Sequence, residues 1–155
     1  MKNEKISELY GKVGVIVAFS QMIEYNLAMV FSFNEILTAF DKVDSIYIYE
    51  YNDIVKKANN WYEKINNNTL GFALNKIKGI NFFSSDFEKQ LNHILKKRNY
   101  VVHNIFKEDI GKDEMLNNTE SFFPMLEELI EKMNNINTQL CDIILMQKKE
   151  YKTIY

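Results

Sequence analysis

Residues 122–143 have the sequence FFPMLEELIEKMNNINTQLCDI, in which apolar side chains recur at regular intervals. The intervals alternate strictly between four and three residues, at Phe122, Leu126, Leu129, Met133, Ile136, Leu140 and Ile143. This period predicts an α-helix with one apolar stripe, and Pro124 falls in its first turn, where a missing N–H costs little. The stripe could line a helical bundle or form a coiled coil with a second subunit, and about three heptads favour the bundle.

A second strong helix signal lies in residues 85–106. Ser85 and Glu88 have the spacing of a capping box, in which the serine hydroxyl accepts from the third helical N–H and the glutamate reaches back. Apolar residues then keep the helical period to about Phe106. We therefore expect a helix that begins at Ser85.

The first part of the chain predicts one long helix over residues 5–40, which could bend near Gly14. Residues 45–51 are rich in residues that favour strands, but no second strand is available for pairing. We expect that segment to be irregular or helical.

The middle of the chain predicts shorter helices. Residues 51–65 return to a helical pattern, and three asparagines at residues 66–68 interrupt it. Thr69 can cap a short helix that runs to about Lys78. Residues 108–118 contain a glycine and two asparagines and predict a loop.

Length and composition agree with this helical pattern. The chain has 155 residues, of which 46% are hydrophobic and 26% charged, as expected for a single globular domain over residues 1–155. Only 5 glycines and 1 proline are present, too few for the turns of a many-stranded protein. We predict an all-α, up-and-down helical bundle of four to six helices.

Several features bear on compartment and partners. Cys141 is the single cysteine, which excludes an intramolecular disulfide and a cysteine-pair zinc site and suits the cytoplasm. The start of the chain does not have the pattern of a secretory signal. The apolar run of residues 13–33 contains Gln21, Glu24 and Asn26, so we interpret it as a core helix rather than a membrane span. The net charge of -2 requires that any nucleic-acid binding come from a local basic patch.

Common catalytic motifs are absent, but one pair of residues has chemical potential. Arg98 is the only arginine and lies five residues before His103, one of two histidines. On a helix, Asn99 and His103 share a face, and Arg98 lies about 140° around the axis and roughly 7.5 Å along it from His103. A guanidinium can grip two phosphate oxygens, and an imidazole can exchange a proton near neutral pH.

These are the groups that RNA cleavage without a metal ion needs, and we expect no cofactor. A base takes the proton of the ribose 2′-OH, and a cation stabilises the phosphorane that follows. Three lysines near Arg98 predict an RNA-binding patch along the same helix, and these are Lys96, Lys97 and Lys107. Lys89 adds to the patch.

The stretch Arg98-Asn99-Tyr100-Val101-Val102-His103 resembles the signature of the HEPN family, an arginine, an adjacent polar residue and a histidine four to six residues after the arginine. Residues 19–24 and residues 69–71 are also similar to family members. The resemblance implies a metal-independent endoribonuclease, commonly a toxin or phage-defence effector, with two motif helices that face each other across a homodimer cleft. It assigns Arg98 to phosphate, His103 to proton transfer and Asn99 to positioning.

The same resemblance implies an antitoxin or another regulatory protein as a partner. Family toxins that are silenced by nucleotidylation of a tyrosine carry it two residues after the histidine, where this chain has Ile105. The sequence therefore departs from the pattern that this route of control requires.

Other interpretations remain open. The chain could be an inactive HEPN module that binds a nucleotide or a protein partner, or a purely structural bundle in which Arg98 forms an ion pair with no cleft. Glu24 could be a structural hydrogen-bonding group or could line the cleft. Trp61 and the nine tyrosines could stack on bases, but aromatic residues at helical spacing more often form the core.

Overall fold

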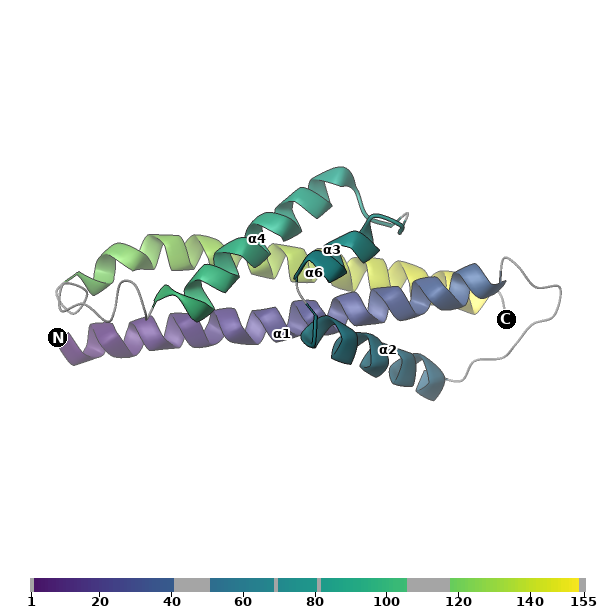
Figure 1. The fold of residues 1–155 in the computed structure, drawn as a ribbon, viewed down its shortest axis with the longest axis horizontal. Coiled ribbons are helices and arrows are strands. Elements are labelled where there is room, and N and C mark those ends of the chain that lie inside the picture. Colours follow the sequence, from purple (N-terminus) through teal and green to yellow (C-terminus); the bar gives the residue numbers. More distant parts are fainter. Residues whose placement is uncertain (1, 41–50, 69, 81, 106–117, 154–155) are drawn as a thin grey trace.

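The computed structural model describes residues 2–40, 51–68, 70–80, 82–105 and 118–153, and within these residues every regular element is a helix. The α-helices in the described ranges are α1 (Lys2–Phe40), α2 (Tyr51–Asn66), α3 (Leu70–Ile77), α4 (Ser85–His103) and α6 (Phe123–Thr153), and a 3-10 turn, η2 (Thr119–Phe122), precedes α6. In Figure 1, α1 and α6 lie side by side along their lengths, and α2 and α4 run back in the opposite direction. The predicted all-α bundle is confirmed.

The apolar stripe of residues 122–143 packs inside the bundle, mainly against α1. Its central residues are all buried, namely Leu126, Leu129, Met133, Ile136 and Leu140. Two polar contacts join α6 to α1: the Asn26 amide donates to the Asn137 side-chain oxygen at 2.7 Å, and the Gln147 amide donates to the Val30 carbonyl at 3.0 Å. The stripe therefore serves the core of this chain, as the bundle interpretation predicted.

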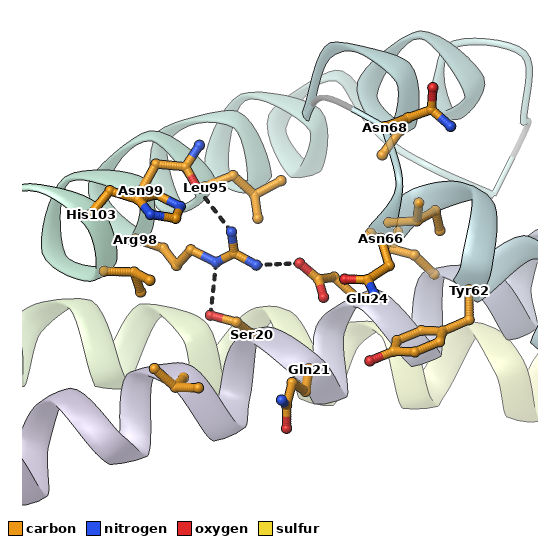
Figure 2. Close-up of a pocket in the computed structure, with 15 residues that line it drawn as sticks. Ser20, Gln21, Glu24, Tyr62, Asn66, Asn68, Leu95, Arg98, Asn99 and His103 are labelled. Atoms are coloured by element: carbon orange, nitrogen blue, oxygen red, sulfur yellow. Dashed lines mark hydrogen bonds and ion pairs between the residues drawn. The ribbon is translucent and has the colours of Figure 1, made fainter.

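α1 is one continuous helix of 39 residues, with no interruption at Gly14. It contacts α2, α4 and α6, so it buries apolar residues on more than one face. Among the described residues it is also the one helix whose length and apolar composition would allow it to cross a membrane. The polar side chains of Ser20 and Glu24 on this helix both lie on the side that faces α4 (Figure 2).

An aromatic cluster fixes the end of α2 and the start of α3 against α1. Trp61 makes an edge-to-face contact with Phe31 of α1, with ring centroids 5.2 Å apart, and its ring lies 6.3 Å from that of Phe72 of α3. Such pairs contribute about 0.5–1.5 kcal/mol beyond the area they bury. α2 ends at Asn66, as the run of asparagines predicted. The predictions for residues 45–50, for Thr69 and for residues 108–117 lie outside the described residues.

α4 begins where the sequence predicted, but its cap is the preceding residue. The hydroxyl of Ser84, not of Ser85, accepts from the Phe87 backbone N–H at 3.1 Å, because Ser84 has an extended backbone (φ -79°, ψ 155°) and Ser85 is already helical. With Ser84 as the N-cap, the third helical residue is Phe87 and not Glu88, and a phenylalanine side chain cannot accept from the backbone N–H of the cap. The predicted capping box of Ser85 and Glu88 is therefore wrong. The helix ends at His103, three residues before the predicted end at Phe106.

Candidate active site

One face of α4 carries the predicted catalytic residues, and the rest of the helix anchors them. Leu91, Ile94 and Val101 are buried in the core. The stripe that borders a cleft comprises Leu95, Arg98, Asn99, Val102 and His103, at positions i, i+3, i+4, i+7 and i+8 of the helix. Helical spacing therefore brings all three predicted catalytic side chains to the same opening.

The facing wall of the cleft comes from α1 and from the α2–α3 junction (Figure 2). The α1 residues Val17, Ser20, Gln21 and Glu24 again have the spacing of one helical face. Tyr62, Asn66 and Asn68 close the end of the cleft away from His103. The cleft has a volume of about 690 Å³, within the range of roughly 300–1,000 Å³ that is usual for ligand sites.

Arg98 extends across the cleft and is held by three side chains (Figure 2). Its Nε donates to Ser20 Oγ at 3.0 Å, and its Nη1 donates to Asn99 Oδ1 at 2.9 Å. Its Nη2 forms an ion pair with Glu24. Ser20 is itself fixed, because its hydroxyl donates to the Ile16 carbonyl at 2.7 Å.

These contacts leave part of the guanidinium available. An arginine has five N–H groups, one on Nε and two on each terminal nitrogen. The contacts to Ser20, Asn99 and Glu24 use one N–H on each nitrogen, so one N–H on each terminal nitrogen has no partner among the described residues. Each of these N–H groups can donate to a phosphate oxygen.

Glu24 has both roles that the sequence left open, since it binds Arg98 and lines the cleft. Its side chain is only 15% exposed. Burial raises the pKa of this carboxyl above its usual value, and the charge and hydrogen bond of Arg98 oppose that rise. The pKa of Glu24 is raised overall, because desolvation of the carboxylate outweighs its stabilisation by Arg98.

Replacing Glu24 by glutamine is expected to remove a pH dependence from the stability of the protein. The folded-state pKa of Glu24 is raised above the unfolded value of about 4.3, so between these two values the folded protein binds the proton more tightly. The free energy of unfolding of the wild type therefore falls as pH rises through that window. Urea denaturation between about pH 4 and pH 8 should show this fall in the wild type and not in Glu24→Gln.

Glu63→Gln is the matched control, because Glu63 is an exposed glutamate of α2 that does not line the cleft. It should keep the pH dependence of the wild type. A difference in unfolding free energy between the wild type and Glu24→Gln that is constant over this pH range would contradict the assignment.

His103 and Asn99 lie beside Arg98 on the α4 wall (Figure 2). Asn99 accepts from Arg98 with its side-chain oxygen, and its NH₂ group, which has no partner among the described residues, can donate to a ligand. His103 is exposed, in the last turn of α4, and makes no hydrogen bond to another described residue. An imidazole in this position can exchange a proton with a ligand in the cleft.

The predicted RNA-binding lysines lie apart from these residues. Lys96 and Lys97 are exposed on α4 but do not line the cleft. Lys97 instead borders a shallow hollow of about 180 Å³ beside α6, together with His93 and Lys132. Lys107 is outside the described residues.

Sequence reasoning missed Ser20 and Tyr62 as cleft residues. The available signal on α1 was the i, i+4 spacing of Ser20 and Glu24 within an apolar run, which places two polar side chains on one face. The signal for Tyr62 was weaker, because it is one of nine tyrosines. Among the described residues, no group of three or more His, Cys, Asp or Glu side chains could hold a metal ion.

Comparison with known proteins identifies the family. The model of the RiboL-PSP-HEPN family matches residues 4–135, which include every residue of the cleft. Neither the search of curated proteins nor that of solved structures finds a match. Because the match covers most of the chain and contains both Arg98 and His103, this protein belongs to the RiboL-PSP-HEPN family.

Proposed function

We propose that the protein is a metal-independent endoribonuclease that acts as a toxin or phage-defence effector. The observation that carries the proposal is that Arg98 and His103 open into one cleft, with Asn99 between them on the same helix. A fixed guanidinium beside an exposed imidazole suits cleavage of a phosphodiester that has an adjacent hydroxyl group.

In the proposed reaction, a His103 ring nitrogen takes the proton of the ribose 2′-OH. The 2′-oxygen attacks phosphorus in line with the 5′-oxygen, and the two remaining N–H groups of Arg98 bind the charged oxygens of the phosphorane. The bond from phosphorus to the 5′-oxygen breaks, that oxygen takes a proton from solvent water, and the protonated His103 then releases its proton to solvent. The products are a 2′,3′-cyclic phosphate and a 5′-hydroxyl.

A second function is favoured by the Arg98–Glu24 ion pair. The Glu24 carboxylate offsets part of the positive charge that a phosphorane requires, so the cleft also suits a non-catalytic module that binds a nucleotide or a protein partner. Cleavage of RNA distinguishes the two functions. Purified protein should degrade total RNA to the same extent with and without EDTA, and intact RNA under both conditions would favour the binding module.

We further infer a symmetric homodimer in which the two α4 helices lie near the two-fold axis. One arginine and one histidine make a small site, and a two-fold interface would place a second pair opposite the first. Sedimentation velocity should give a dimer at micromolar concentration. A monomer under these conditions, or a dimer with the two α4 helices on opposite outer surfaces, would contradict the inference.

A further inference from the structure

A second hollow adjoins the cleft and is lined by residues of α1 and α2. It has a volume of about 680 Å³, and Tyr62 and Gln21 line both it and the cleft. Its other exposed lining residues are Ala18, Met22, Tyr25 and Asn59. The two hollows are therefore neighbours that share one wall.

The second hollow differs from the cleft in its chemistry. None of the residues that line it is charged. Tyr25 and Tyr62 form an edge-to-face pair with ring centroids 6.1 Å apart, and Tyr25 is 39% exposed. Gln21 and Asn59, which carry side-chain amides, line the same hollow. Aromatic faces with neighbouring amides bind unpaired nucleobases, whereas phosphates require positive charge.

We propose that this hollow, defined by Tyr62, Tyr25, Gln21 and Asn59, binds unpaired bases of a single RNA strand whose scissile phosphate lies at Arg98. The proposal rests on the proposed ribonuclease function and adds the substrate class, single-stranded RNA, and the path of the strand. Charge is divided along this path: the Arg98 guanidinium and the His103 imidazole line the cleft, and the uncharged rings of Tyr62 and Tyr25 line the second hollow.

The contact between the two hollows favours RNA over a protein partner. A strand held at Arg98 must leave the cleft, and Tyr62 and Gln21 form the boundary that it would cross on this side. Met22 is 48% exposed beside them, so an apolar surface is available for base planes.

The test measures binding of a single-stranded 2′-O-methyl RNA of about eight nucleotides, within the usual footprint of single-strand sites, by fluorescence anisotropy with the wild-type protein. This RNA lacks the attacking hydroxyl, so binding is observed without cleavage. Tyr62→Ala is expected to weaken binding about 5- to 150-fold, the range found when a stacking ring is removed. Tyr62→Phe, which keeps the ring, should bind as the wild type does.

Tyr10→Ala is the matched control, because Tyr10 is 57% exposed on α1 and lines neither hollow. It should bind RNA normally. Tyr25→Ala should weaken binding, and double-stranded RNA of the same length should bind more weakly than the single strand. Thermal unfolding verifies that each variant is folded.

The outcomes separate this proposal from the ribonuclease function. If the wild type cleaves RNA but Tyr62→Ala binds and cleaves normally, the base-binding surface is wrong and the nuclease remains. If free nucleoside monophosphates bind as tightly as the strand, the hollow holds a single nucleotide and the strand path is wrong. If Tyr62→Ala changes the oligomeric state, seen as a changed sedimentation coefficient, and this change accounts for the weaker RNA binding, the surface is a protein interface and the proposal is overturned.

Discussion

His103→Ala is expected to lower the rate of RNA cleavage by about two to four decades, the usual contribution of a general acid or base. His103 is exposed at the end of α4 and borders the cleft, so its removal should leave the core and the Arg98 contacts in place. Binding of 2′-O-methyl RNA should persist, because His103 acts on the proton and not on affinity. Single-turnover cleavage of a labelled RNA, with anisotropy for binding, measures both quantities.

His93→Ala is the control, since His93 is the other histidine of the chain and is exposed on the same helix. It borders the hollow beside α6 and not the cleft. It should cleave at the wild-type rate. Equal rates for His103→Ala and the wild type would remove His103 from the chemistry.

Arg98→Lys is expected to lower the cleavage rate by about two to three decades although it keeps the positive charge. Lysine cannot reproduce the planar fork that binds Ser20, Asn99 and Glu24 at once and still presents two N–H groups to a phosphate. The charge retained beside Glu24 should keep the variant folded. Initial rates and thermal unfolding, measured on the same preparation, separate lost chemistry from lost structure.

Arg98→Ala is a less informative variant because it leaves the Glu24 carboxylate without its charge partner. Removal of one member of a desolvated pair destabilises a protein in its own right. Lys97→Ala is the control for general charge, since Lys97 is adjacent in sequence but lies outside the cleft. It should retain cleavage, and its effect should be confined to the salt dependence of RNA binding. Wild-type activity in Arg98→Lys would contradict a requirement for the guanidinium.

Local periodicity explains the success of the sequence predictions. The four- and three-residue steps of residues 122–143 predicted the buried face of α6, because a helix converts spacing into direction without knowledge of its neighbours. The same rule placed Asn99 and His103 on one face of α4. The shift of the cap from Ser85 to Ser84 is a one-residue error, which arises because adjacent serines have the same capping chemistry.

Contacts between segments that lie far apart in the sequence could not be predicted from local periodicity. Arg98 meets Glu24 across 74 residues of sequence and Ser20 across 78, and no periodic pattern encodes such a pairing. The lysine patch was inferred from proximity in sequence, whereas the helix turns Lys97 by about 100° from Arg98 and toward α6. The position of Tyr62 depends on the packing of Trp61 against α1 and α3, which only the assembled bundle determines.

The most direct test of the central claim, attack by the ribose 2′-OH in the Arg98–His103 cleft, is the fate of one RNA with a single cleavage site. A methyl group on the 2′-oxygen at that site alone removes the nucleophile. The account predicts that the unmodified RNA yields a 2′,3′-cyclic phosphate and a 5′-hydroxyl, with EDTA present, and that the methylated RNA stays intact. Cleavage of the methylated RNA, or products that carry a 5′-phosphate and a 3′-hydroxyl, would contradict it.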